Sequence, residues 1–170
     1  CGILGYICVQ NKTIREDFLT SLVELKHRGP DASGIYENDK KSLILGHLRL
    51  SIIDLSTNSN QPFFSKDNRF IIVYNGELYN FKEIKNDCKL QTQTTGDTEV
   101  ILETYVQHGS NSFAWLNGMF AFAIYDIHEN KLTLCRDRFG IKPLYYYFDG
   151  TIFAFASELK ALKKMKGLDL

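Results

Sequence analysis

The sequence opens Cys1-Gly2-Ile3-Leu4-Gly5-Tyr6-Ile7-Cys8-Val9, an apolar run that directly follows a cysteine standing first in the chain. Residues 3–9 of this run predict a buried strand. A thiol is weakly nucleophilic until it loses its proton, and its reference pKa is about 8.5. An α-amino group has a reference pKa of about 8, so near neutrality part of it is an uncharged amine that accepts such a proton. Cys1 can therefore supply a nucleophile and its base, unless it is only an arbitrary starting point of the numbering.

Strand patterns outnumber helix patterns in the rest of the chain. Residues 43–55 are β-rich with a break at Gly46-His47, and residues 70–74 form an apolar strand that is predicted to end at Asn75-Gly76. The last four strands are predicted over residues 118–127, 131–136, 143–148 and 151–156. Turn-forming residues within each of the two pairs predict hairpins.

Helical patterns lie between and after these strands. The shorter ones cover residues 14–26, 82–88, and a last stretch from about Ser157-Glu158 to Lys164. A longer helix is predicted to start with Asp97 or Thr98 as its cap and to stop before Gly109. Strands that follow one another through tight turns favour antiparallel sheets with helices on their outer faces. The sequence therefore predicts an α/β (α+β) fold in which two sheets stack.

Length and composition exclude several classes of protein. The 170 residues fit one domain, and 44% of them are hydrophobic and 24% charged, as in globular proteins. Basic and acidic residues both number 20, so no net charge attracts nucleic acid or a membrane surface. No apolar stretch approaches the ~18 residues of a membrane-spanning helix. The four cysteines form no metal-binding spacing, so we expect reduced thiols, a cytoplasmic location and no metal site.

Three polar stretches interrupt apolar strands and are candidates for chemistry. Arg49 stands between two leucines, where a guanidinium either forms an internal ion pair or binds a ligand carboxylate. Asn75-Gly76 is a hairpin signal, but no second strand follows it, so the asparagine amide and the glycine N–H are also a plausible pair of oxyanion donors. Asp97 is either a helix cap or an acceptor for a substrate ammonium.

Together the candidates have complementary roles. They comprise a thiol with its own base, two oxyanion donors, a cation for a carboxylate and an anion for an ammonium. A free α-amino acid with a side-chain carbonyl is the substrate that such a set would fit. This inference assumes that the candidates converge in space.

The motifs resemble, in order, those of one enzyme family. They are Cys1-Gly2-Ile3, His27-Arg28-Gly29-Pro30-Asp31, Arg49-Leu50-Ser51-Ile52-Ile53-Asp54, Gln61-Pro62, Asn75-Gly76-Glu77, Gly96-Asp97-Thr98-Glu99, Gly118 to Ala123, Arg136 to Tyr145 and Ser157 to Leu162. They are similar to the glutaminase domain of glutamine-hydrolysing asparagine synthetases, which are class II glutamine amidotransferases. The resemblance covers essentially the whole chain.

The resemblance implies a fold and a reaction. The fold is the four-layer αββα sandwich of amino-terminal-nucleophile hydrolases, with two mostly antiparallel sheets formed by residues 1–170 as one domain. In the reaction, Cys1 would attack the side-chain amide of L-glutamine and form a thioester that water hydrolyses to glutamate. Asn75 and Gly76 would hold the oxyanion.

The resemblance also assigns substrate contacts and partners. Arg49 would bind the α-carboxylate of glutamine, Glu77 and Asp97 its α-ammonium, and Leu50 and Ile52 would add main-chain contacts. The glutaminase step would need no cofactor, whereas ATP and magnesium would belong to a synthetase domain that this chain lacks. We therefore expect a C-terminal synthetase domain or a separate synthetase subunit as partner, and a homodimer is compatible with the family.

Two alternatives stay open at this point. The same glutaminase could serve another acceptor, as in the sugar amidotransferase or cyclase-type relatives. The domain could also be a non-catalytic docking module, although the intact candidate set argues against this. Release of ammonia from glutamine, lost on replacing Cys1 by alanine, separates the last alternative from the first two.

Overall fold

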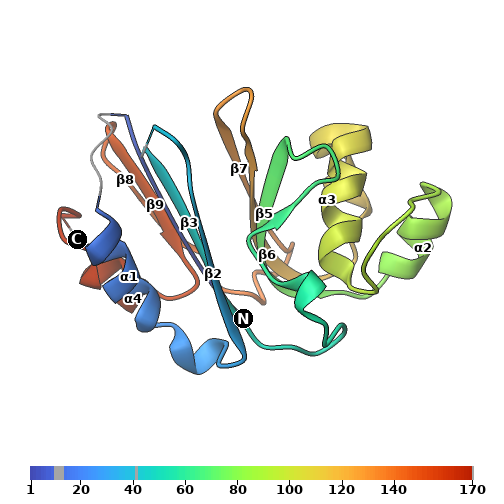
Figure 1. The fold of residues 1–170 in the computed structure, drawn as a ribbon, viewed down its shortest axis with the longest axis horizontal. Coiled ribbons are helices and arrows are strands. Elements are labelled where there is room, and N and C mark those ends of the chain that lie inside the picture. Colours follow the sequence, from blue (N-terminus) through green and yellow to red (C-terminus); the bar gives the residue numbers. More distant parts are fainter. Residues whose placement is uncertain (10–13, 41, 170) are drawn as a thin grey trace.

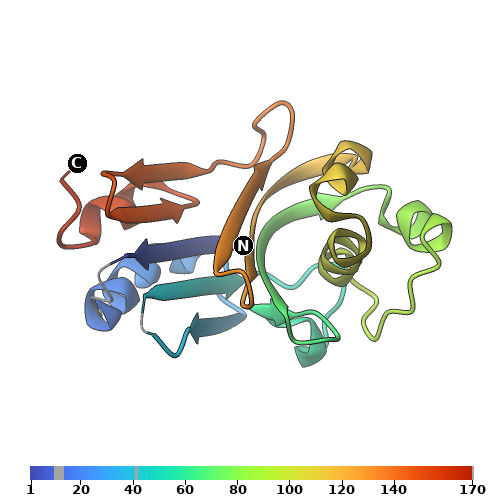
Figure 2. The same ribbon diagram turned by 90° about the horizontal axis from the view of Figure 1, so that it is seen from above.

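The computed structural model describes residues 1–9, 14–40 and 42–169. Two antiparallel sheets stack face to face, and helices cover their outer faces (Figures 1 and 2). This arrangement confirms the predicted fold class. No helix in these described ranges is long and apolar enough to cross a membrane.

The first sheet contains β1 (Gly2–Cys8), β2 (Ala32–Glu37), β3 (Leu43–Arg49), β8 (Tyr145–Phe148) and β9 (Ile152–Ala156), in the order β2-β3-β1-β9-β8. The second contains β4 (Phe63–Phe64), β5 (Phe70–Leu78), β6 (Gly118–Asp126) and β7 (Lys131–Arg136), in that order. The α-helices are α1 (Arg15–Val23), α2 (Phe81–Asp87), α3 (Asp97–His108) and α4 (Leu159–Lys164). Short 3₁₀ turns are formed by η1 (Lys26–Arg28), η2 (Thr57–Ser59) and η3 (Gly109–Trp115).

Alternation along the strands sorts apolar side chains into separate layers. Successive residues of a strand point to opposite faces. Ile3, Leu45 and Val73 therefore belong to a buried cluster between the two sheets. Their neighbours Leu4 and Ile44 pack under α1 and α4 in one outer layer, and residues of β5 and β6 pack with α3 in the other. The N-terminus lies at one end of the layer between the sheets (Figures 1 and 2).

Two strands differ in extent from the sequence patterns, and the β-rich pattern over residues 50–55 is not a strand. β3 runs without a break through Gly46-His47 and ends at Arg49, because residues 43–48 pair with β1 and Arg49 pairs with Ala32 of β2. β5 does not end at Asn75-Gly76 but continues to Leu78, with Gly76 opposite Phe120 of β6. The prediction of a strand end at Asn75-Gly76 is therefore wrong, and the hairpin-turn alternative falls with it.

Other differences concern edges and caps. β2 was not predicted, since the stretch Ala32–Glu37 lies at the sheet edge and has no clear apolar alternation. The predicted helix 14–26 is divided into α1 and η1. Neither Asp97 nor Thr98 caps α3, because Gly96 occupies the cap position and both residues lie in the first turn. Gly109, with a φ of 62°, ends this helix as predicted.

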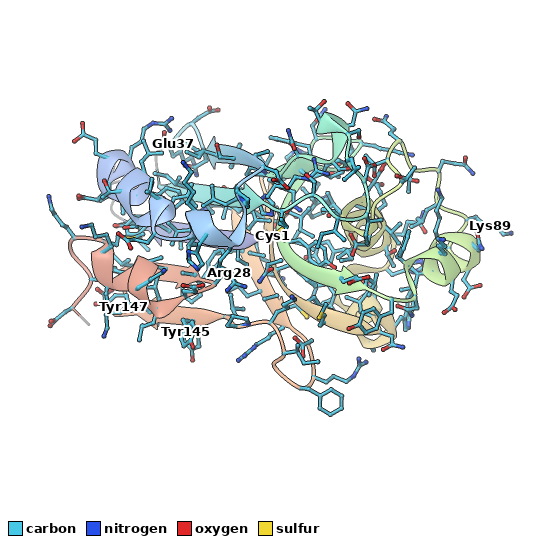
Figure 3. All side chains as sticks on the ribbon, turned by 90° about the horizontal axis from the view of Figure 1, so that it is seen from below. Cys1, Arg28, Glu37, Lys89, Tyr145 and Tyr147 are labelled. Carbon is cyan, nitrogen blue, oxygen red and sulfur yellow. The ribbon has the colours of Figure 1, made fainter. Side chains whose placement is uncertain are left out.

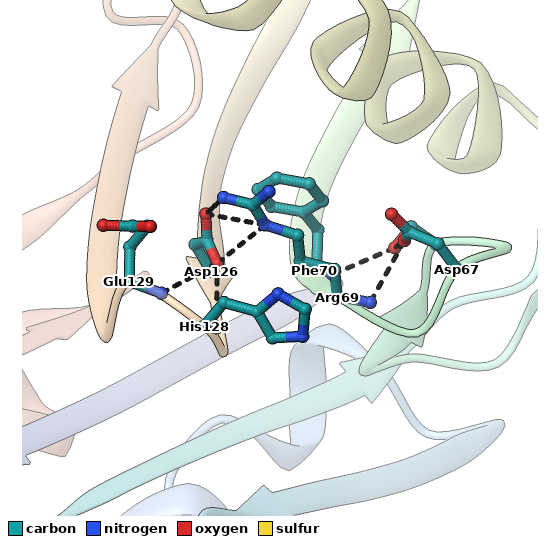
Figure 4. Close-up of polar contacts among 7 residues, drawn as sticks. Asp67, Arg69, Phe70, Asp126, His128 and Glu129 are labelled. Carbon is teal, nitrogen blue, oxygen red and sulfur yellow. Dashed lines mark hydrogen bonds and ion pairs between the residues drawn. The ribbon is translucent and has the colours of Figure 1, made fainter.

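Polar contacts close one end of the second sheet (Figure 4). Arg69, just before β5, forms a two-pronged bond to Asp126 at the end of β6, with Nη2–Oδ2 at 2.7 Å and Nε–Oδ1 at 3.1 Å. Asp126 also accepts the backbone N–H groups of His128 and Glu129 in the following turn. The polar candidates on β5, residues 75–77, lie toward the opposite end of this strand.

Candidate active site

A pocket of about 130 Å³ lies at the end of the inter-sheet layer where the N-terminus is found. Its lining includes all eight residues singled out from the sequence: Cys1, Arg49, Leu50, Ile52, Asn75, Gly76, Glu77 and Asp97. Alternation explains three of these positions, because each is an even number of residues from an apolar member of the inter-sheet cluster: Cys1 stands two before Ile3, Asn75 two after Val73 and Arg49 four after Leu45. The assumed convergence is thus present, while the individual roles stay predictions.

Cys1 is fixed at both ends of the residue. Its Sγ lies 3.4 Å from the backbone N of Leu50 and 3.6 Å from the Leu50 oxygen. Its carbonyl oxygen accepts a hydrogen bond of 2.9 Å from Arg28 Nε (Figure 3). The thiol therefore has a defined position at the pocket wall.

The α-amino group of Cys1 is an unusually weak base. Burial lowers its pKa from 8.0 to about 6, the nearby cations Arg28 and Lys142 act in the same direction, and Asp31 opposes them. Since each of these cations destabilises a charged amine, most of the amino group is neutral at neutral pH. The residue can therefore accept the proton of its own thiol.

Arg28 is itself held in place by a second contact. Its Nη1 lies 2.9 Å from Glu158 Oε1, which also lies 2.8 Å from His27 Nε2. Burial opposes ionisation of Glu158, but the bonds from Arg28, His27 and Lys160 lower its pKa to about 2. A charged Glu158, just before α4, thus anchors the arginine that holds Cys1.

The edge of β5 explains how a backbone donor reaches the pocket. β4 begins only at Phe63, directly after Pro62, and pairs with Ile71 and Ile72, so β5 continues past it unpaired. On this free edge the Tyr74 N–H donates to Gln61 Oε1 at 2.6 Å, and the Leu78 N–H donates to Asp97 Oδ2 at 2.9 Å.

Gly76 lies between these two capped positions. Its N–H points to the same free edge, because residues two apart in a strand face the same side. Phe120, opposite Gly76 on β6, directs its own N–H and C=O to Asp137 instead. A Cβ atom on residue 76 would lie 2.3 Å from the Met119 oxygen, so glycine is required at this close approach. Among the described residues we find no hydrogen bond from the Gly76 N–H, so this group can donate to a ligand in the pocket.

Asn75 supplies a second unused donor. The residue is only 2% exposed, yet its Nδ2 has no hydrogen-bond partner among the described residues. A buried amide without a partner carries a cost of about 1–3 kcal/mol, so a ligand that accepts its proton would be stabilised. Asn75 Nδ2 and Gly76 N–H are neighbouring donors of the kind that stabilises an oxyanion.

Arg49 presents a buried positive charge. Its guanidinium donates to the Ser56 oxygen and to Asn60 Oδ1, each at 2.7 Å, and to the carbonyl oxygen of Asp54. No carboxylate is among its partners in the described ranges, so the internal ion pair considered from the sequence is absent there. Neutral acceptors fix the guanidinium and leave its charge available to a ligand anion.

Two carboxylates line the same pocket. Asp97 Oδ2 accepts hydrogen bonds from the Tyr74 hydroxyl at 2.7 Å and from the Leu78 N–H. Burial raises the pKa of Asp97, and these two bonds only partly oppose the rise. Glu77 is partly exposed at the pocket. With Arg49, the pair gives the pocket charges of both signs, as a zwitterion requires.

Leu50 and Ile52 form the rim of the pocket. Their side chains are 42% and 68% exposed. The Leu50 backbone groups lie against the Cys1 thiol, as given above, so the main chain of Leu50 fixes the position of this sulfur.

Further lining residues were not singled out from the sequence. They include Ser59, Gln61, Tyr74, Thr98, Met119 and Lys142. Gln61, Thr98, Met119 and Lys142 stand inside the quoted motifs, so the motifs located them without indicating a pocket role. Met119 follows from alternation, since it faces the inter-sheet layer like Ala121. In the described part of the chain no cluster of three or more histidine, cysteine or acidic side chains is placed to hold a metal ion.

Comparisons with known proteins show the family of the chain. The family described as "Glutamine amidotransferase domain" matches residues 1–170. A "Putative asparagine synthetase [glutamine-hydrolyzing] 2" of Methanocaldococcus jannaschii is 41% identical over 99% of this chain and 36% of its own length. The "Amidase chry2" of Gibberella zeae is 39% identical over 88% of this chain and 23% of its own length. The chain thus spans about a third or less of these relatives.

A solved structure shares the fold. Glutamine phosphoribosylpyrophosphate amidotransferase from B. subtilis superposes with a TM-score of 0.82 at 24% identity, covering 97% of this chain and 43% of that one. At this identity the likeness concerns the architecture of the two sheets and their helices.

Proposed function

The chain belongs to the glutamine amidotransferase domain family, and from this premise we propose that it hydrolyses L-glutamine to L-glutamate and ammonia with Cys1 as nucleophile. The observation that carries the proposal is the pairing of two unused donors, Asn75 Nδ2 and Gly76 N–H, with a thiol whose own amine is a weak base. Nothing in packing requires this combination.

The reaction proceeds in two halves. The Cys1 amine takes the thiol proton, and the thiolate forms a bond to the side-chain amide carbon of glutamine. Asn75 and Gly76 donate to the resulting oxyanion. The Cys1 ammonium then returns its proton to the leaving nitrogen, the carbon–nitrogen bond breaks, and ammonia departs. Water attacks the thioester by the reverse sequence of proton transfers and releases glutamate with the free thiol.

Substrate binding uses the charged groups of the pocket. Arg49 binds the α-carboxylate, and its fixed guanidinium favours two parallel hydrogen bonds. Asp97 and Glu77 receive the α-ammonium. Leu50 and Ile52 contact the substrate at the rim through their main chain.

The ammonia acceptor belongs to this proposal too. Because the M. jannaschii relative is named as an asparagine synthetase, we assign the ammonia to an ATP- and magnesium-dependent synthetase domain or subunit that makes asparagine. The amidase relative supports a second candidate, in which the same glutaminase serves another acceptor. Addition of ATP, magnesium and aspartate to the protein together with its synthetase partner distinguishes the two by whether asparagine forms.

The glutaminase step is tested by ammonia release from glutamine. The wild-type protein, beginning at Cys1, should release ammonia and glutamate in equal amounts. Cys1→Ala should release none while retaining the fold by circular dichroism. Equal ammonia release by both proteins would exclude Cys1 as the nucleophile, and none by the wild type would favour a docking role.

A further inference from the structure

His47 lies in the layer between the sheets, close to the proposed oxyanion donors. It stands on β3 two residues after Leu45, so its ring enters the same buried layer, and it is 0% exposed. Its Nε2 lies 3.0 Å from the carbonyl oxygen of Tyr74 on β5. This bond connects the first sheet to the second at the residue that precedes Asn75.

The bond fixes the protonation state of the ring. A carbonyl oxygen only accepts, so the Nε2 of His47 carries the hydrogen and Nδ1 is left as a lone pair. Nδ1 has no partner among the described residues. Burial lowers the pKa of His47 to about 3, and the Cys1 amine and Arg49 disfavour a further positive charge. His47 is therefore a neutral donor and takes no part in proton transfer.

The Tyr74 carbonyl lies where the sheet gives it no partner. On the free edge of β5, the Tyr74 N–H is taken by Gln61 and the Tyr74 oxygen by His47. Gln61 and His47 therefore make the hydrogen bonds to Tyr74 that a longer β4 would make. They orient the peptide groups on either side of Tyr74, and the next two donors along the strand are Asn75 and Gly76.

Packing alone gives no reason for a histidine at this position. The residues on the same face of β3 are Leu43 and Leu45, and a third aliphatic side chain would fill the layer without a polar atom to satisfy. An imidazole with an unpartnered buried nitrogen reduces stability by about 1–3 kcal/mol. A residue retained at such a cost beside a reactive centre is expected to serve it.

We propose that His47 is a positioning residue of the glutaminase, which holds the Tyr74 carbonyl and thereby aims Asn75 Nδ2 and Gly76 N–H at the oxyanion formed on Cys1. This inference rests on the proposed function. It predicts an effect on the transition state, because a donor displaced by a fraction of an ångström still permits substrate to bind.

A matched pair of variants tests the role. In His47→Gln the side-chain amide nitrogen takes the place of Nε2 and keeps a donor to Tyr74, whereas in His47→Asn it takes the place of Nδ1 and loses it. We expect His47→Asn to lower kcat about tenfold or more with KM changed less than about threefold. His47→Gln should recover most of the wild-type kcat.

An aldehyde analogue of glutamine reports on the oxyanion donors directly. The Cys1 sulfur adds to the aldehyde carbon, and the carbonyl oxygen takes a proton or remains an oxyanion in the position of the transition-state oxygen. In His47→Asn its affinity should fall by the same factor as kcat/KM, while the affinity for glutamate, which forms no adduct, stays within about threefold of wild type.

Leu45→Ala is the control, because it damages the same buried layer and leucine has no donor for a hydrogen bond to Tyr74. It should lower the unfolding midpoint and leave kcat within about threefold of wild type.

If His47→Asn does not fold, Gln61→Met, which removes the other restraint on Tyr74, should show the same loss of kcat and of aldehyde affinity. A wild-type kcat in the variant tested, or an equal loss in His47→Gln and Leu45→Ala, overturns the role of His47. A wild-type protein that releases no ammonia overturns the proposed function itself.

Discussion

At the scale of single residues, the basicity of the Cys1 amino group sets the pH at which the thiol can react. With a pKa of about 6 in the folded protein, the amine is charged below this pH and neutral above it. Only the neutral form accepts the thiol proton. We expect kcat/KM for glutamine to rise with pH through about 6 and then level off.

A pH profile of ammonia release between about pH 5 and 8 measures this midpoint. A midpoint near 8.0, the ordinary value of an α-amino group, would contradict the role of burial.

The lowered pKa of the Cys1 amino group also affects the stability of the fold. Between about 6 and 8 the unfolded chain binds more protons at this group than the folded one, so the free energy of unfolding should increase with pH there.

Asn75 provides the second test at this scale. Removal of one oxyanion donor costs about 3 kcal/mol of transition-state stabilisation, so Asn75→Ala should lower kcat by about two to three orders of magnitude. KM should change far less, since the ground-state amide needs this donor less. Steady-state kinetics of ammonia release measure both kcat and KM of this variant. A variant with raised KM and normal kcat would show that Asn75 binds substrate instead.

Sequence motifs located the charged and nucleophilic residues of the pocket, because their chemistry is recognisable without neighbours. Arg49 between two leucines and Asp97 beside a glycine both drew attention in this way. His47 did not, since the dipeptide Gly46-His47 was interpreted as a break in a strand. Its role depends on Tyr74, a residue 27 positions away on the other sheet, and no local pattern contains that information.

At the scale of elements, one loop brings Lys142 to the pocket. The segment between β7 and β8 is organised by Asp137, whose carboxylate accepts the N–H groups of Phe139, Ile141 and Lys142 and that of Phe120 on β6. Burial opposes its ionisation, but these bonds lower the pKa of Asp137 overall. The sequence motif over residues 136–145 therefore encodes a loop shape.

Asp137→Asn should weaken this loop, because one oxygen of the carboxylate becomes a donor that faces backbone N–H groups. Hydrogen bonds to a charged acceptor contribute about 1.5–3 kcal/mol, so we expect a loss of about 2 kcal/mol in the free energy of unfolding. Urea denaturation measures it. Asp39→Asn, at an exposed position, should change stability by less than about 0.5 kcal/mol. Equal midpoints for both variants would refute the importance of the Asp137 bonds.

Strand ends were the elements that the sequence predicted least well. Asn75-Gly76 is a frequent turn signal, yet pairing with β6 carries the strand through it to Leu78. The error has a structural reason, because glycine is required at residue 76 by the close approach to the Met119 oxygen rather than by a turn. β2 lies at the other sheet's edge, where partial burial weakens apolar alternation.

At the scale of the whole molecule, one buried cluster contains apolar side chains of both sheets, so we expect them to unfold together. The layered architecture was predictable because several strands are apolar on both faces, as a strand between a partner sheet and a helix layer must be. The positions of the two sheets relative to each other were not, since they depend on contacts between residues distant in sequence.

This coupling can be tested with Trp115, the single tryptophan, which lies in the outer layer of the second sheet. Phe18 is fully buried in the opposite outer layer, and Phe18→Ala should destabilise the protein by about 3–5 kcal/mol. If unfolding is cooperative, the Trp115 fluorescence transition and far-UV circular dichroism shift together. Val23→Ala, at an exposed position of the same helix, should leave both in place. If Phe18→Ala left the midpoint of the Trp115 fluorescence transition unchanged, the two sheets would unfold as independent units.

The late start of β4 has a further meaning. Proline has no N–H and is favoured at the first residue of a strand or before it, so Pro62 delays the partner of β5 until Phe63. In the proposed reaction, the substrate oxyanion accepts the Gly76 N–H, a hydrogen bond that an earlier-starting β4 would otherwise take. An insertion that lets β4 begin earlier would pair this edge of β5, and we expect it to abolish ammonia release with Cys1 unchanged.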